Sequence, residues 1–125
     1  MVNAGIKENV IDPYKKDNDV SLYLTTYAND TIDELTSFYE TKHLNLLDPN
    51  KSNQRTTMLT ALEMIRNEPL DFIIVSRFDI RWYQKIADLN VDYNKFNFLY
   101  KEVEPEWSNN RFVSDIIFLF PRFFL

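Results

Sequence analysis

The sequence predicts an α/β fold in which a mostly parallel sheet is flanked by helices. Three observations lead to this prediction. Residues 20–27 alternate apolar and other side chains with the period of a β-strand. Apolar residues recur at helical spacing in residues 31–39 and again in residues 52–66. Residues 71–75 form a short apolar run directly after a predicted helix, which is typical of a strand covered on both faces in a parallel sheet.

The composition is that of a single acidic domain. The chain has 125 residues, no cysteine and a formal net charge of -5. The absence of cysteine excludes a disulfide framework and a thiolate zinc site. The acidic balance disfavours a general nucleic-acid binder, because phosphate backbones gain no long-range attraction. The single glycine, Gly5, excludes a P-loop and a Rossmann dinucleotide fingerprint, since both need several glycines.

The chain carries no pattern typical of a membrane protein. No apolar run approaches the ~20 residues of a membrane-spanning helix. Polar residues follow Met1 where a signal peptide would need an apolar core. We therefore expect a cytoplasmic protein without a membrane span. No internal repeat or linker divides residues 1–125, so we expect one domain.

The N-terminal part is predicted to lead from a loop into a strand and a helix. The first residues show no sustained period, and residues 12–19 are rich in charge and turn formers, which indicates a loop. The strand at 20–27 follows. Thr31 and Glu34 then have the spacing of a capping box, which predicts the start of a helix of about three turns.

The middle of the chain is predicted to hold a short strand and a second helix. Residues 44–47 form the strand, and His43 before them is interpreted as a helix-end or surface imidazole. The sequence supplies no nearby partners that would make this only histidine a base or a metal ligand. Ser52 is the predicted N-cap of the second helix, whose apolar stripe covers the sheet, and Asn67 and Pro69 end it.

After the strand at 71–75, the C-terminal part is predicted to hold short elements. Residues 80–86 indicate an amphipathic turn or helix, and residues 102–107 an acidic loop. Residues 97–100 and 113–120 are strand candidates, the last with an embedded Asp.

Charged side chains follow the predicted buried strand. In open α/β sheets the ligand crevice lies beyond the carboxyl ends of the strands, so Arg77 and Asp79 stand where binding chemistry is expected. Asp79 could hold a divalent cation whose other positions bind phosphates. Arg77 could neutralise a phosphate through paired hydrogen bonds. The structural alternative is a salt bridge between Arg77 and either Asp79 or Asp71 that caps the sheet.

Four further residues are candidates for the same crevice. Asp115 lies before an apolar run and could act as a general base, a second metal contact or a strand-end cap. Trp107 could stack on a sugar ring or serve as ordinary packing. Tyr27 and Asn29, which follow the first strand, could line the crevice.

The order of these segments resembles the GT-A type of glycosyltransferase-like proteins, which have the nucleotide-diphospho-sugar transferase fold. The match extends over most of the chain, from residues 20–27 through Arg77-Phe78-Asp79 to Trp107 and Val113-Ser114-Asp115. The resemblance implies a partial GT-A, Rossmann-like architecture and transfer of a sugar from a nucleotide-sugar donor to a hydroxyl of a glycan or other acceptor. It also implies Mn²⁺ or Mg²⁺ on the diphosphate. Asp79 would be the metal-contacting acid of an Asp-x-Asp-like motif whose first acid is replaced by Arg77.

The ends of the chain depart from that family. A GT-A domain opens with a strand and a glycine-containing loop that hold the nucleotide, whereas here a polar segment leads directly to what resembles the second strand. The chain stops at the apolar residues 120–125. We therefore expect a GT-A-like domain that is shortened at both ends. Its exposed strand edges and apolar area would favour self-association.

Two other functions compete with sugar transfer. A non-catalytic structural or interaction domain would keep the sheet and lose the donor pocket, and the missing glycine-containing loop favours it. A metal-dependent nuclease that uses Asp79 and Asp115 is disfavoured, because neither strand has the usual acid-x-Lys continuation and the chain is acidic.

Overall fold

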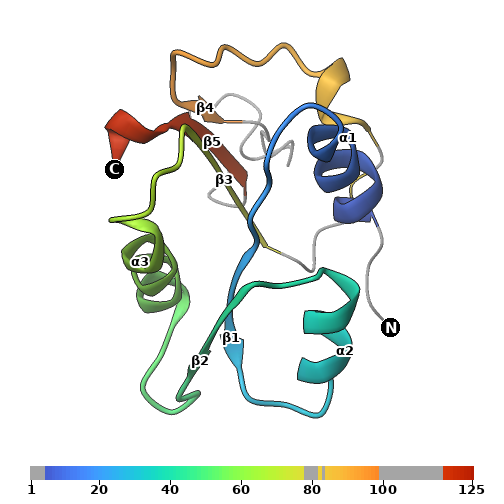
Figure 1. Cartoon of the computed structure of the whole chain (residues 1–125). Helices are drawn as coiled ribbons and strands as arrows, with labels where there is room; N and C mark the ends of the chain where they lie inside the picture. Colours follow the sequence, from blue (N-terminus) through green and yellow to red (C-terminus); the bar gives the residue numbers. More distant parts are fainter. Residues whose placement is uncertain (1–4, 78–81, 83, 99–116) are drawn as a thin grey trace, which may run out of the picture.

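The computed structural model describes residues 5–77, 82, 84–98 and 117–125. These residues form a mixed α/β protein (Figure 1). Its elements follow in this order: η1 (Lys7–Ile11), α1 (Asp12–Lys15), β1 (Tyr23–Tyr27), α2 (Ile32–Phe38), β2 (His43–Leu47), α3 (Gln54–Ile65), β3 (Phe72–Ser76), η2 (Ile86–Asp88), β4 (Asn97–Phe98), β5 (Ile117–Pro121) and η3 (Arg122–Phe124).

The described strands form two sheets. β1 pairs in parallel with β2, from Tyr23 opposite His43 to Tyr27 opposite Leu47. β5 lies between β3 and β4 and runs antiparallel to both. The α/β class is confirmed, but the prediction of one mostly parallel, Rossmann-like sheet is wrong. The apolar run of β3 indicates burial, yet burial does not fix strand direction, and the neighbour of β3 is an antiparallel strand.

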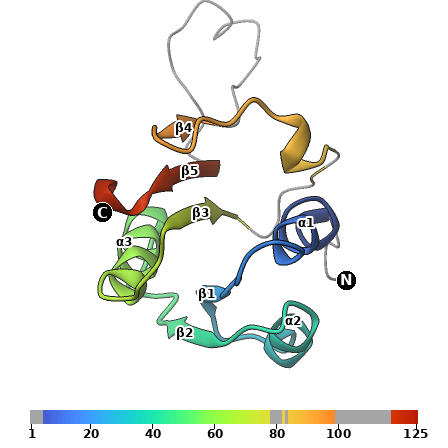
Figure 2. The ribbon, with the colours of Figure 1, turned by 45° about the horizontal axis from the view of Figure 1, so that its top comes forward.

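Helices lie on both sides of the strands (Figure 2). α3 lies on one side, where Ile65 packs in a buried cluster with Ile73 and Phe120. η1, α1 and α2 lie on the other side, where Val10 and Ile11 belong to two further clusters. The arrangement places the strands between helices.

The segment predicted as an N-terminal loop contains helical turns. Ile6, Val10 and Tyr14 recur every four residues, so they lie on one face of a helix. Val10 and Ile11 are buried, and Pro13 stands in the first turn of α1, where its missing N–H leaves no bond unmade. The loop prediction was wrong because it weighed the charged and turn-forming residues above this apolar spacing.

The starts of two helices differ in detail from the predictions. α3 is capped by Asn53 rather than Ser52. The Asn53 carboxamide oxygen accepts a bond of 3.1 Å from the Thr56 N–H, and the Thr56 hydroxyl accepts one of 2.8 Å from the Asn53 N–H. Thr31 precedes α2 but makes no side-chain cap bond, so the predicted capping box is wrong. Instead, the Asn29 carboxamide accepts from the Thr31 N–H.

His43 begins β2 and does not lie at the end of a helix. Its ring stacks on the Tyr23 ring, with centroids 4.6 Å apart and planes within 6°.

The predicted strands near the C-terminus are described only in part, because residues 99–100 and 113–116, like the predicted loop at 102–107, lie outside the described residues. Within the described ranges, no helix has the length and apolar character needed to cross a membrane.

Candidate functional site

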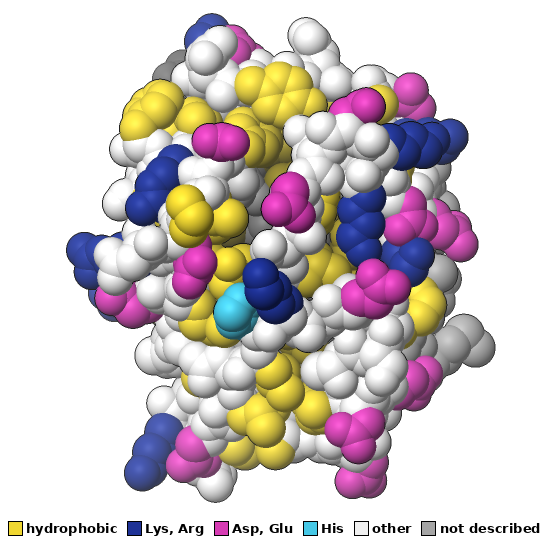
Figure 3. All heavy atoms as spheres, viewed as in Figure 1, with side chains coloured by type: hydrophobic (Ala, Val, Ile, Leu, Met, Phe, Trp, Pro, Cys, Tyr) yellow, Lys and Arg dark blue, Asp and Glu magenta, His cyan; other side chains and the backbone are white. Residues whose placement is uncertain are grey.

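A cavity of about 1320 Å³ lies between β1 and β3. Its lining includes every residue from Val20 to Tyr27 and every residue from Leu70 to Arg77. The two strands belong to different sheets and are not hydrogen-bonded neighbours. Figure 3 shows a hollow in the surface close to the histidine, with apolar side chains visible inside it. The cavity therefore separates two strands that lie in the same layer of the molecule.

The long walls of the cavity are mainly apolar. α3 contributes four apolar lining residues on one side, Met58, Ala61, Leu62 and Ile65, together with the polar Gln54 and Thr57. The opposite wall includes Ile6, Val10, Ile11, Tyr39 and Trp82. Such walls favour a ligand with apolar parts and a few well-placed polar groups.

Two of the predicted site residues lie at the same end of the cavity. β1 and β3 run in the same direction in Figure 1, Tyr27 is the last residue of β1, and Arg77 directly follows β3. Both side chains belong to residues that line the cavity. Arg77 is exposed, and the half-buried Tyr27 hydroxyl lies 3.3 Å from the Thr57 hydroxyl on α3. Tyr27 and Arg77 therefore line the same cavity, and their role in ligand binding stays a prediction.

Of the other predicted site residues, Asn29 alone is among the described ones. Asp79, Trp107 and Asp115 lie outside the described residues. Asn29 does not line the cavity; its amide nitrogen donates to the Tyr27 carbonyl at 2.9 Å, so it holds the turn after β1. A role of Asn29 in ligand binding stays a prediction.

The proposed Arg77–Asp71 salt bridge does not fit the extended strand. Asp71 precedes β3 and Arg77 follows it. Six steps of extended chain separate their backbones by about 20 Å, which is beyond the reach of the two side chains. The charged groups at the two ends of the strand therefore act separately.

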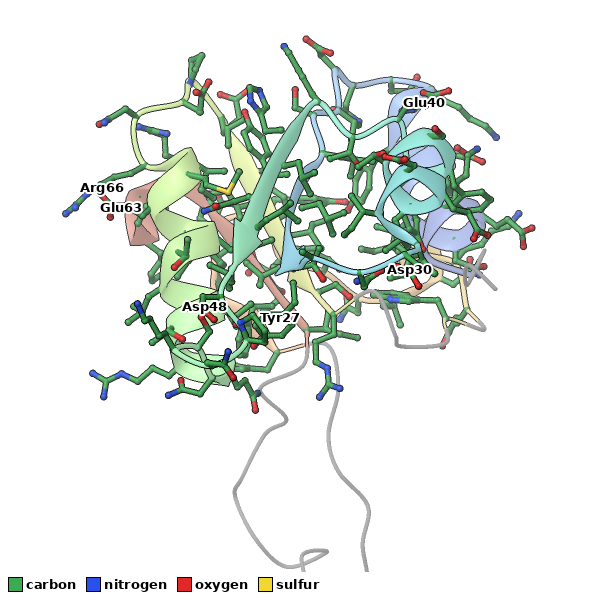
Figure 4. The ribbon with its side chains drawn as sticks, turned by 90° about the horizontal axis from the view of Figure 1, so that it is seen from below. Tyr27, Asp30, Glu40, Asp48, Glu63 and Arg66 are labelled. Carbon is green, nitrogen blue, oxygen red and sulfur yellow. The ribbon has the colours of Figure 1, made fainter. Side chains whose placement is uncertain are left out.

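The described residues contain no group of three or more His, Cys, Asp or Glu side chains that could hold a metal ion. Figure 4 shows the end of the molecule that carries Tyr27, with Asp48 and Asp30 on either side of it in this view. These two aspartates follow β2 and β1 and do not form such a group. Asp79, the predicted metal ligand, lies outside the described residues.

Two tyrosines in the cavity wall were not recognised from the sequence. The Tyr14 hydroxyl lies 3.0 Å from the Tyr93 hydroxyl; burial raises the pKa of Tyr14, and the bond to Tyr93 raises it further. Burial also raises the pKa of Tyr23, with a smaller contribution from the Glu68 carboxylate. Both hydroxyls therefore stay protonated at neutral pH. The spacing of Tyr14 from Val10 was the signal that could have placed it in a wall.

Trp82 carries a buried hydrogen-bond donor in the cavity wall opposite α3. The residue is 9% exposed, and its indole N–H has no hydrogen-bond partner within the described part of the chain. An unsatisfied buried donor costs about 1–3 kcal/mol. Each such group calls for an explanation, and an acceptor on a bound molecule is one.

A second, smaller hollow of about 360 Å³ lies between α3 and the C-terminal residues. Its charged lining residues, Glu63 and Arg66, are both exposed and approach each other to 3.2 Å (Figure 4). They pair along one face of α3, and Arg66 lines no part of the larger cavity. Arg66 is therefore a suitable reference residue for tests of Arg77.

The fold and the cavity define an α/β protein with a gap between two strands. Comparison of the chain with protein-family models, curated proteins and solved structures gives no match. Its function is therefore argued from the chemistry of the site.

Proposed function

We propose that the chain binds a nucleotide-diphospho-sugar at the carboxyl ends of β1 and β3 and transfers the sugar to a hydroxyl acceptor in the cytoplasm. The observation that carries the proposal is that Tyr27 and Arg77 line one cavity at the ends of two strands. Ligands of open α/β proteins bind at such ends. Arg77 neutralises the diphosphate with charge-assisted bonds, and Tyr27 lines the donor pocket.

Three residues outside the described ranges complete the proposed site. Asp79 would hold Mn²⁺ or Mg²⁺, and Trp107 would stack on the sugar. The metal would stabilise the negative charge of the departing nucleoside diphosphate. Asp115 would accept the proton of the acceptor hydroxyl while the oxygen of that hydroxyl forms a bond to the anomeric carbon of the sugar. The bond between the anomeric carbon and the nucleoside diphosphate breaks at the same time, and the nucleoside diphosphate leaves.

Calorimetric titration of the full chain with nucleotide-sugars, with and without Mn²⁺, tests this function. Because a hydrogen bond to a charged group contributes about 1.5–3 kcal/mol, we expect Arg77→Ala to weaken donor binding roughly 10- to 100-fold. Arg66→Ala removes the same charge outside the cavity and should leave donor affinity unchanged. Asp79→Ala should abolish the effect of Mn²⁺. Absence of metal-assisted binding, or equal binding by Asp79→Ala, contradicts the proposal.

A second function, a non-catalytic interaction domain, is favoured by a different observation. β1 and β3 face one cavity without pairing with each other, and unpaired strand edges are sites for association with another chain. β2 adds an outer edge on which Leu44 is 40% and Leu46 47% exposed. This edge supports the proposal that the chain also associates with itself.

A further inference from the structure

We propose that the cavity between β1 and β3 is a slot for one β-strand, supplied by an extended apolar peptide of another chain. The proposal rests on the interaction function described above and gives it a partner class. It shares Tyr27 and Arg77, at one end of the cavity, with the proposed sugar-transfer site, but it requires no nucleotide-sugar and no metal.

The backbone of β3 presents alternate residues to the slot. The Arg122 N–H donates to the Asp71 carbonyl at 3.1 Å, in line with the antiparallel register between β3 and β5. In an antiparallel pair, hydrogen-bonded residues alternate with residues that turn their backbone groups away. Ile73 and Val75 therefore bond to β5. The residues with N–H and C=O groups directed toward the slot are Phe72, Ile74 and Ser76.

The backbone of β1 presents alternate residues in the same way. The His43 N–H donates to the Leu22 carbonyl at 3.4 Å, in line with the parallel register between β1 and β2. The same alternation directs the backbone groups of Leu24 and Thr26 to β2. The residues with backbone groups directed toward the slot are Tyr23, Thr25 and Tyr27. Two rows of backbone donors and acceptors thus face the same cavity.

The size of the cavity suits one strand. Five extended residues are about 17 Å long, and with normal strand spacing and sheet thickness they occupy about 800 Å³. The cavity has a volume of about 1320 Å³. A peptide in this slot would join the two sheets into one, in the order β2-β1-peptide-β3-β5-β4.

The walls require a peptide that is apolar on both faces. Ala61 and Leu62 line the slot from α3, and Val10 and Ile11 line it from the opposite side. A strand covered by helices on both sides is typically a continuous apolar run. The indole N–H of Trp82 in the second wall has no hydrogen-bond partner among the described residues, which is an independent sign that the cavity has an occupant.

The charges at the two ends indicate the direction of the peptide. Where β1 and β3 begin, the lining contains Glu68 and Asp71, with Asp19 and Lys42 also present. The Glu68 carboxylate contributes to the raised pKa of Tyr23, which supports its position near the start of β1. Arg77 lines the other end. A peptide parallel to β1 and β3 places a basic N-terminal residue beside the acids and an acidic C-terminal residue beside Arg77.

A fluorescently labelled peptide with the sequence Lys-Val-Ile-Val-Ile-Val-Glu tests the proposal by anisotropy with the full chain. A second peptide with N-methyl groups on alternate amides keeps the side chains and removes backbone donors, so we expect it to bind at least roughly tenfold more weakly. A third peptide with the Lys and Glu exchanged should also bind more weakly. Failure of the first peptide to bind, or equal binding by the N-methylated one, overturns the proposal.

Amide hydrogen exchange at residue resolution distinguishes strand addition from side-chain binding. Saturation with the first peptide should slow exchange at Thr25 and Ile74 roughly tenfold or more, because their N–H groups face the slot. Exchange at Ile73 and Val75 should change much less, since these amides already bond to β5. Binding that leaves Thr25 and Ile74 unprotected overturns the proposal.

A pair of variants on α3 tests whether the peptide binds in this cavity. Ala61→Phe fills the slot and should abolish peptide binding, whereas Leu59→Phe adds bulk at an exposed position outside the slot and should not. Arg77→Glu provides a second test if Ala61→Phe does not fold, and it should favour the peptide with exchanged charges. Equal peptide binding by Ala61→Phe and Leu59→Phe overturns the proposal. If the chain binds nucleotide-sugar but no peptide, only the proposal of a peptide slot is contradicted. If it binds peptide but no nucleotide-sugar, only the proposal of sugar transfer is contradicted.

Discussion

Asn53 determines where α3 begins. Its side chain accepts a bond from the Thr56 N–H, so one of the otherwise unpaired first-turn donors is satisfied. Replacement of Asn53 by Ala should lower the free energy of unfolding by about 1 kcal/mol in urea denaturation. Ser52→Ala is the matched control and should cost clearly less, because Asn53 provides the cap. If Ser52→Ala lowered the free energy of unfolding more than Asn53→Ala does, Ser52 would be the N-cap.

Tyr14 makes the stability of the fold sensitive to alkaline pH. Burial, followed by the bond to Tyr93, raises the pKa of Tyr14 above its ordinary value of 10.0. The unfolded chain therefore loses this proton at lower pH than the folded chain. The stabilisation is fully present below the unfolded pKa and is lost as pH rises through the folded pKa.

Denaturation across a pH series measures this effect. The free energy of unfolding should fall as the pH rises beyond 10.0. Tyr14→Phe should reduce the slope of that decline. Part of the decline should remain in this variant, because the pKa values of Tyr23 and Tyr39 are also raised. An unchanged slope in Tyr14→Phe would show that this hydroxyl ionises equally in both states.

At the scale of elements, η1 is part of the core. Ile11 is 5% exposed and packs with Leu35 and Tyr39 in one buried cluster. Ile11→Ala should lower the free energy of unfolding by about 2–5 kcal/mol, because it removes buried methyl groups and leaves a cavity. The matched control is Glu8→Ala in the same helix, where the exposed side chain should contribute less than about 0.5 kcal/mol. If Ile11→Ala and Glu8→Ala both change the free energy of unfolding in urea by equally small amounts, the N-terminal segment would be a loose loop.

Local patterns predicted the existence of most elements and part of the site. The alternation in residues 20–27 located β1, and the apolar run at 71–75 located β3 within one residue at each end. Tyr27 and Arg77 could be placed at one site because both lie at strand ends. Local patterns could not give the direction of β5, because pairing between residues distant in sequence depends on the whole fold. The same limit hid Trp82 as a cavity residue, whereas the four-residue spacing of Tyr14 from Val10 was a local signal that the loop prediction passed over.

At the scale of the whole molecule, helices rather than strands connect the two sheets. Ile65 on α3 packs with Ile73 of β3, and Tyr23 of β1 contacts the same cluster. The Thr25 hydroxyl donates to the Met64 sulfur at 3.3 Å, which ties β1 to α3. No sequence pattern could reveal the gap, because each strand on its own has the composition of a normally paired strand.

This arrangement predicts unequal stability in the two sheets. β1 and β2 form a two-stranded sheet with one wall of the cavity at its edge, whereas β3 lies beside β5, which is paired on both edges. Two-stranded sheets are marginal without further support. In native-state hydrogen exchange of the peptide-free chain, the amides of Leu24 and Thr26 should exchange roughly tenfold or more faster than those of Ile73 and Val75. Equal protection would mean that α3 couples the sheets into one cooperative unit despite the gap, and that filling the slot would add little to the stability of β1.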